Sequence, residues 1–204
     1  MYAAEQDGAS ATAERLASQI GVTPVAGGVH PRFGTRNVIF PLAQGRYLEV
    51  VEVLEHPAAE KAPFGQVVRA RSQEGGGWLG WVIRVDDISA QERRLGRHAV
   101  EGSRCRPDGV ELRWLQLGVK GLQADPQLPF FVKWLDGPHP SEGASEVTLE
   151  ALTIAGDQGR VRDWIGLVEG EKVSPELGLD FVMPHGTPGI MAVTFGTPEG
   201  EITI

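Results

Sequence analysis

The residue best placed to do chemistry in this sequence is Glu49, which lies in the apolar run YLEVVEVL (47–54). A charge among apolar neighbours is expensive to bury unless it has a partner. A carboxylate in such a place can ligate a metal, act as a general base, or accept a hydrogen bond from a substrate. The alternative is a carboxylate on the surface of a strand that points to solvent. We take Glu49 as the first catalytic candidate, and as the candidate metal ligand.

Two more polar candidates lie in the Gly-rich segment GGVHPRFGTRN (27–37). Residues in loops often carry function, so His30 is a second catalytic candidate, as an acid, a base or a ligand. Asn37 is a substrate-binding candidate, because its amide could orient a polar group. The alternatives are a hydrogen bond that fixes the turn around His30, and backbone capping by Asn37 at the start of a strand.

The other substrate-binding candidates lie in apolar strands later in the chain. Arg113 and Lys133 would suit a carboxylate or an enolate if they face a cavity. Otherwise their stems lie along the surface and their charges stay in water. Trp81 and Trp134 could form an aromatic wall for a flat substrate, although aromatic residues more commonly pack in cores.

Composition and missing motifs exclude several classes of function. A formal net charge of −8 disfavours non-specific binding to nucleic acid or to anionic membranes, and no apolar run is long enough to cross a bilayer. The single cysteine, Cys105, excludes an internal disulfide and fits a reducing cytoplasm. The sequence has no phosphate-binding loop, no C-x-x-C or H-E-x-x-H zinc spacing and no G-x-S-x-G nucleophile motif. We therefore expect a small-molecule ligand, with no nucleic-acid or membrane partner.

The elements that must position these residues begin with a helix and a hairpin. Apolar residues at helical spacing predict a helix over 9–20, capped by Asp7 and stopped by Gly21. A hairpin then joins a strand at 38–42 to a strand at 46–54. The second of these strands carries the main catalytic candidate.

A second unit repeats this order. It opens with a strand in 78–87, and Ser89 with Glu92 forms a capping box at the start of a short helix. A P-D-G turn then leads into a strand at 110–119, and a further strand follows at 128–137.

A third, smaller unit follows the linker PHPSEGAS (138–145). It contains a strand at 147–156, a short helix that begins near Asp157, and three short strands at the end of the chain. Residues 55–76, rich in charge and glycine, are expected to connect the first two units.

Three similar units in one chain indicate a supersecondary motif that is copied and paired. We predict a strand-rich α+β protein in which the paired sheets curl around a cavity. The predicted boundaries are 1–137 for the paired region, with modules at 1–54 and 77–137, and 146–204 for the third part. A cup of this kind would hold a small molecule.

The chain also resembles the glyoxalase-like branch of the vicinal oxygen chelate superfamily, over nearly its whole length. The motifs that carry the resemblance are GGVHPRFGTRN (27–37), RYLEV (46–50), WVIRVDDI (81–88), LPFFVKW (128–134) and TPEGEITI (197–204). The resemblance implies βαβββ modules paired into a half-open barrel. We therefore predict paired βαβββ modules that form a cupped half-barrel, with a third partial βαβββ module. The resemblance also implies a divalent metal inside, held by His and Glu residues of the first and last strands of each module.

Carried over residue by residue, the resemblance assigns one of the four ligands. Glu49 matches the last-strand carboxylate of the first module. The first-strand position falls in 1–4, which contain no histidine, so either that strand is missing or the true start lies upstream. In the second module the two positions fall at Gly80 and near Lys133. Two alternatives for the cofactor therefore stay open: a divalent metal bound at Glu49, or no metal.

Three functions remain open at this point. The first is a lyase, isomerase or dioxygenase-type enzyme with Glu49 as ligand or base and His30 and Asn37 nearby. The second is a metal-free protein of the same fold that binds or sequesters a small molecule. In the third, a homodimer completes a cavity that one chain leaves unfinished, because strand edges can pair between chains.

Overall fold

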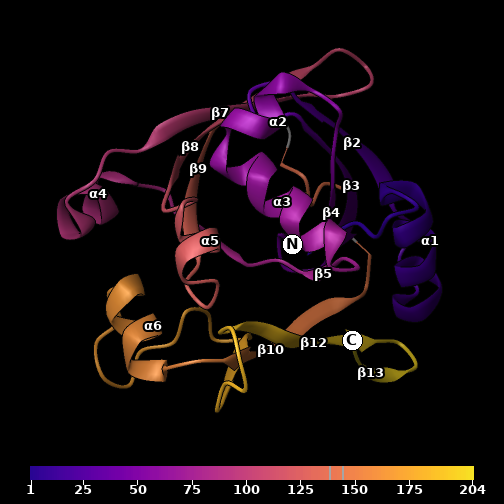
Figure 1. Cartoon of the computed structure of the whole chain (residues 1–204). Coiled ribbons are helices and arrows are strands. Elements are labelled where there is room, and N and C mark those ends of the chain that lie inside the picture. The colour runs from indigo at the N-terminus through magenta and orange to yellow at the C-terminus, as the bar shows by residue number, and fades with distance from the viewer. Residues whose placement is uncertain (138, 144) are drawn as a thin grey trace.

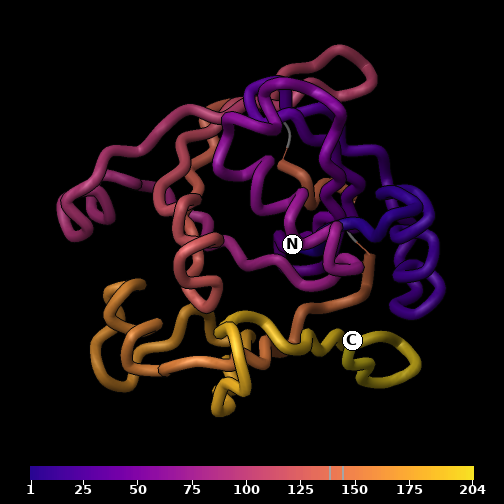
Figure 2. Tube along the Cα trace, viewed as in Figure 1, coloured from indigo at the N-terminus to yellow at the C-terminus, as the bar shows by residue number. Residues whose placement is uncertain are grey.

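The structure, a computed structural model, describes residues 1–137, 139–143 and 145–204 (Figures 1 and 2). These residues form a nine-stranded mixed sheet and a separate four-stranded sheet, with helices outside and between them. The α+β class is therefore confirmed. Within the described ranges, no helix combines the length and the apolar character that a membrane span requires.

The first half of the large sheet has the strand order β1-β4-β3-β2, in which β1 runs parallel to β4. The first strand is therefore present, although the sequence indicated too little room for it, because two residues suffice to pair with β4. The elements are β1 (Tyr2–Ala3), α1 (Ala9–Ile20), β2 (Val25–His30), β3 (Thr35–Leu42) and β4 (Arg46–Val53).

The second half repeats this arrangement with the order β7-β8-β9-β6, in which β6 runs parallel to β9. The two halves join edge to edge, because Val29 of β2 pairs with Cys105 of β7. The short strand β5 (Gly77–Trp78) lies antiparallel beside β1. The elements of this half are β6 (Val82–Arg84), α4 (Ser89–Leu95), β7 (Val100–Cys105), β8 (Glu111–Leu117), α5 (Gly121–Ala124) and β9 (Phe130–Asp136).

The connector between the halves is helical. Residues 55–76 contain α2 (Pro57–Lys61) and α3 (Pro63–Gln73), each with a proline at its first position, where the missing N–H has no helical partner. Figure 1 shows the strands of the large sheet curving around α3. Phe64 and Val68 of α3 are buried, so the connector fills part of the space that the sheet encloses.

The C-terminal part has the expected element order but a different strand order. Its sheet runs β11-β10-β12-β13, with the first strand β10 parallel to β11. In the two halves of the large sheet, the first strand instead pairs with the last. The expectation of a third βαβββ copy is therefore wrong in topology. Its elements are β10 (Thr148–Ala155), α6 (Gln158–Ile165), β11 (Gly178–Val182), β12 (Gly189–Thr197) and β13 (Gly200–Thr203).

The predicted boundaries of the two modules and of the third part stay a prediction. The linker prediction at 138–145 includes residues 138 and 144, which lie outside the described residues.

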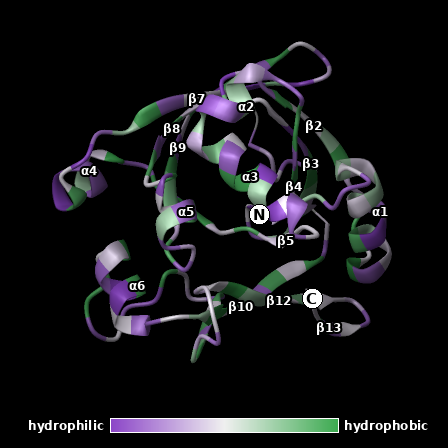
Figure 3. Ribbon diagram, viewed as in Figure 1, coloured by the Kyte–Doolittle hydropathy of each residue, from purple (hydrophilic) through white to green (hydrophobic). Residues whose placement is uncertain are grey.

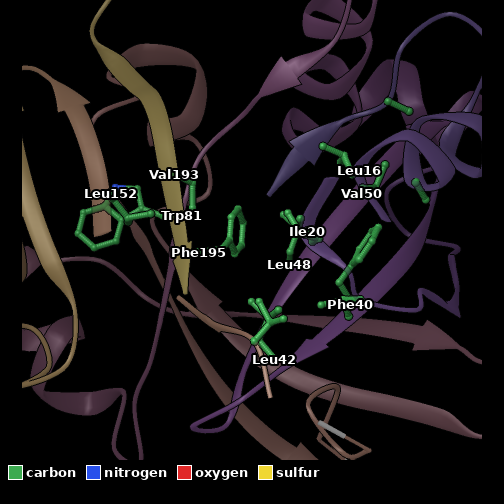
Figure 4. Close-up of a cluster of buried hydrophobic side chains, with 14 of the residues drawn as sticks. Leu16, Ile20, Phe40, Leu42, Leu48, Val50, Trp81, Leu152, Val193 and Phe195 are labelled. Atoms are coloured by element: carbon green, nitrogen blue, oxygen red, sulfur yellow. The ribbon is translucent and has the colours of Figure 1, made fainter. Parts of the chain in front are cut away.

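The small sheet packs on the first half through the largest apolar core. Helix α1 carries both hydrophobic and hydrophilic residues (Figure 3) and turns Leu16 and Ile20 inward. Each fully buried large apolar side chain contributes roughly 1.5–3 kcal/mol. Figure 4 shows side chains of α1, the β3–β4 hairpin and the small sheet converging, among them Leu16, Ile20, Phe40, Leu48, Val50, Leu152, Val193 and Phe195.

Two of the predicted helix caps are wrong. The first N–H of α1, at Ala9, donates to Glu52 at 3.0 Å, and the side chain of Asp7 does not cap the helix. At α4 the helix begins one residue after Ile88, and Ser89 donates its own N–H to Asp87 at 2.9 Å. In both helices a carboxylate other than the predicted capping residue accepts a hydrogen bond from a backbone N–H at the helix start, Glu52 at α1 and Asp87 at α4.

Two glycines let β2 approach its neighbours closely. A Cβ on Gly28 would lie 2.1 Å from the carbonyl oxygen of Cys105, and the residue has a φ of +142°. A Cβ on Gly27 would lie 2.0 Å from Oδ1 of Asn37. These positions therefore set both the junction of the two halves and the placement of a candidate site residue.

We predict that Gly28→Ala lowers the free energy of unfolding by more than about 2 kcal/mol, because the methyl group would displace the β7 backbone. Gly121→Ala is the matched control, since a Cβ there meets no atom within 4 Å and the residue begins α5. Chemical denaturation of both variants provides the measurement. Equal stability of the two variants would contradict the proposed role of the β2–β7 contact.

Candidate functional site

Two adjoining cavities lie against both halves of the large sheet, and the C-terminal part also lines the larger of them, through residues such as Leu149, Leu152 and Val193. We call them the large cavity, of about 350 Å³, and the small cavity, of about 50 Å³. Their shared walls come from β4 of the first half and from β6 and β9 of the second. The residues that line both are Met1, Tyr47, Glu49, Val82, Val132 and Trp134.

Glu49 lies at the junction of these cavities. Its side chain is 12% exposed, and its Oε1 accepts a hydrogen bond of 2.5 Å from Nδ2 of Asn37. Nε2 of His30 lies 3.8 Å from the same oxygen. The structure therefore brings together the three polar residues singled out in 27–37 and in 47–54.

His30 is buried in a setting that keeps it neutral. Its Nδ1 lies 2.9 Å from the hydroxyl of Thr35, and its Nε2 lies 3.4 Å from Nδ2 of Asn37. Burial lowers the pKa of His30 to about 4, an effect that Glu49 opposes and Arg104 reinforces. A neutral ring can donate from Nδ1 and accept at Nε2, as these contacts require.

Asn37 has one amide atom in use and one free. Its Nδ2 donates a hydrogen bond to Glu49, whereas its Oδ1 is buried without a hydrogen-bond partner among the described residues. A buried, unpaired acceptor is unfavourable by roughly 1–3 kcal/mol, and such atoms are rare outside functional sites. The alternative role for Asn37, capping the backbone at the start of a strand, is wrong, because its side chain points toward Glu49 in the interior.

Arg104 of β7 is a site residue that the sequence analysis missed. It is 5% exposed and lines the small cavity. No carboxylate among the described residues lies within 4.0 Å of it, and its Nε has no hydrogen-bond partner there. Burial lowers its pKa, whereas Glu49 and Tyr47 raise it. The P-D-G turn could have revealed this residue. A hairpin turn that leads into the strand at 110–119 needs a partner strand just before the turn, and Arg104 lies in that segment.

Tyr47 shares the face of β4 with Glu49 and was also missed. Burial raises the pKa of Tyr47, and the neighbouring Glu49 adds to the effect. Its ring lies 5.7 Å from that of His139, which lines the large cavity. Tyr47 therefore keeps its proton at neutral pH and can donate a hydrogen bond inside the site.

The cations expected in the cavity lie outside it. Arg113 has a 52% exposed side chain that binds Asp136 at 2.6 Å. Lys133 stands between Val132 and Trp134 in β9, whose side chains line the cavities, so strand alternation directs Lys133 to the opposite face. Neither cation is among the lining residues of either cavity, which corrects the expectation.

The two tryptophans do face the large cavity. Trp134 lines both cavities. Trp81 is 6% exposed, and its indole N–H donates to the carbonyl of Gln127 at 2.9 Å, so only its ring is free to contact a ligand. Phe64 of α3 adds a further aromatic wall to the small cavity.

The donor set around Glu49 does not fit a divalent metal. Within the described residues, no three His, Cys, Asp or Glu side chains come together as a metal site would need. The described residues that line the small cavity with Glu49 include one histidine, His30, and no second carboxylate, and the guanidinium of Arg104 is part of the same lining. A buried cation at that place opposes the binding of a second one.

We predict that His30 makes the protein less stable as the pH falls from about 6.5 to about 4. In this window the unfolded chain binds a proton at His30 and the folded chain does not, so the free energy of unfolding drops by up to about 3 kcal/mol. Denaturation of His30→Gln at several pH values should show that this loss has disappeared. His98→Gln, at a fully exposed side chain, is the control and should keep the slope. An unchanged slope in His30→Gln would contradict the buried neutral histidine.

Comparisons with known proteins place the chain in a family. A family model described as "Glyoxalase-like domain" matches residues 2–165, which include all of the large sheet. A search of curated proteins finds no significant match.

Two solved structures match this chain. A hypothetical protein from Staphylococcus aureus has 15% identity and a TM-score of 0.56, over 89% of this chain and 75% of its own. A methylmalonyl-CoA epimerase from Mycobacterium tuberculosis has 14% identity and a TM-score of 0.42, over 67% of this chain and 85% of its own. At these identities the likeness concerns the fold alone. Since the family match covers most of the sequence, this protein belongs to the glyoxalase-like domain family.

Proposed function

We propose that this protein binds a small organic molecule in the two adjoining cavities, with Glu49 as the polar contact at their junction. One observation carries the proposal: the Glu49 carboxylate, held by Asn37, lies at the junction of the two cavities beside apolar and aromatic residues that include Val82, Val132 and Trp134. Ligand sites typically combine such apolar walls with a few oriented polar groups. The paired modules, in this proposal, serve as a half-barrel cup around the ligand.

A binding function is favoured over a metal-dependent lyase, isomerase or dioxygenase. Those reactions require a metal, and only Glu49 occupies one of the ligand positions that the family resemblance implies. The second candidate is metal-free proton transfer with Glu49 as base. Its support is the neutral His30, whose unprotonated Nε2 lies 3.8 Å from the carboxylate and can take up a proton that Glu49 removes from a ligand.

The homodimer and the cytoplasmic location stay predictions. Molecular mass measured by size exclusion at several concentrations decides the first of them.

A thermal-shift screen with a library of small organic fragments tests the binding function. Val82→Phe places a bulky ring at the junction of the cavities and should abolish the shifts seen with the native chain. Val100→Phe makes the same change at a position that is 57% exposed and should retain them. Hits that persist in Val82→Phe would place binding elsewhere and contradict the proposal.

A second test concerns the metal. We predict that Mn²⁺, Fe²⁺, Ni²⁺ and Zn²⁺ do not raise the melting temperature of protein purified without chelator, because the wall around Glu49 supplies too few ligands. Stoichiometric metal in the purified protein, lost in Glu49→Gln, would support the metalloenzyme instead.

A further inference from the structure

The small cavity holds a positive charge for which the described residues offer no partner. Arg104 is 5% exposed, has no carboxylate within 4.0 Å among the described residues, and leaves its Nε without a hydrogen-bond acceptor there. A buried charge is retained in proteins when it is paired or when it binds something. This side chain lines the cavity, so a ligand can reach it.

The neighbours of Arg104 do not neutralise it. His30 stays neutral because burial lowers its pKa to about 4, and Tyr47 stays protonated because burial raises its pKa. Glu49 is the acidic group that acts on Arg104, but no oxygen of its carboxylate lies within 4.0 Å of the guanidinium. Because Nε of Arg104 has no hydrogen-bond acceptor among the described residues and the side chain lines the cavity, its guanidinium can donate to a ligand there.

The size of the small cavity limits the group that enters it. About 50 Å³ accommodates a compact head group, and the adjoining large cavity of about 350 Å³ takes the rest of the molecule. The large cavity is walled by the rings of Trp81 and Trp134. A planar carboxylate matches the forked geometry of a guanidinium better than a spherical anion does.

We propose that the ligand is a small organic carboxylate with an aromatic or apolar body, whose carboxylate pairs with Arg104 in the small cavity. This inference rests on the proposed binding function and adds the chemical class of the ligand. Asn37 Oδ1, also without a partner among the described residues, could accept a hydrogen bond from a donor next to that carboxylate.

The test uses matched pairs of probes on the full chain. The carboxylates are benzoate, phenylacetate and 3-phenylpropionate, and their primary amides have nearly the same shape without the charge. We expect the native protein to bind at least one carboxylate about 10- to 100-fold more tightly than its amide, as a charge-assisted hydrogen bond provides. In Arg104→Met this preference should fall to about onefold, while the amide still binds and shows that the variant is folded.

Arg106→Met is the matched control, because Arg106 lies two residues away and pairs with Asp108 at the surface. It should keep the preference for carboxylates. Equal binding of carboxylates and amides by the native chain, or a preference that survives in Arg104→Met, would overturn this inference and leave the binding function intact. If no probe of either kind binds the native chain, the binding function fails with it.

A second readout separates a ligand contact from a structural role. Without ligand, Arg104→Met should melt a few degrees higher than the native protein, because an unpaired buried charge has been removed. If Arg104 instead served as the structural counter-ion of Glu49, the same variant would melt lower, and the inference would be wrong.

Discussion

The structure depends on the close approach of two backbones, those of β2 and β7. Gly28 leaves room for the carbonyl of Cys105, and the pairing of Val29 with Cys105 joins two four-stranded halves into one sheet. Each half then supplies one wall of the cavities. Glu49 of the first half and Arg104 of the second line the same small cavity because this contact holds the halves together.

The polar groups in the site are arranged at a cost to stability. His30 is buried and neutral, while the amide oxygen of Asn37 and Nε of Arg104 have no hydrogen-bond partner among the described residues, and each of these groups disfavours folding relative to an apolar residue of similar size. Proteins retain such groups mainly where they act on a ligand. The other ligand positions that the family resemblance implies fall in 1–4, at Gly80 and near Lys133, where no histidine or carboxylate stands, so the chemistry proposed for this site rests on hydrogen bonds and charge.

Much of the fold was accessible from local sequence signals. The hairpin around Glu49, the helix stop at Gly21 and the cap at Asp157 rest on short-range chemistry, and the structure has all three. The caps at α1 and α4 were wrong because distant or adjacent carboxylates took those roles. Arg113 and Lys133 were placed on the wrong face, since the face of a strand is set by the pairing of strands far apart in the sequence. Arg104 was missed for the same reason, as its strand was not recognised.

The measurement that tests the central claim most directly is the position of a bound ligand. Nuclear Overhauser effects between the ring protons of 3-phenylpropionate and the methyl groups of the protein report contacts within about 5 Å. The account predicts effects to Val82 and Val132, which line both cavities. Effects confined to exposed residues such as Val100 or Val182 would show that the ligand binds outside the cup and would contradict the account.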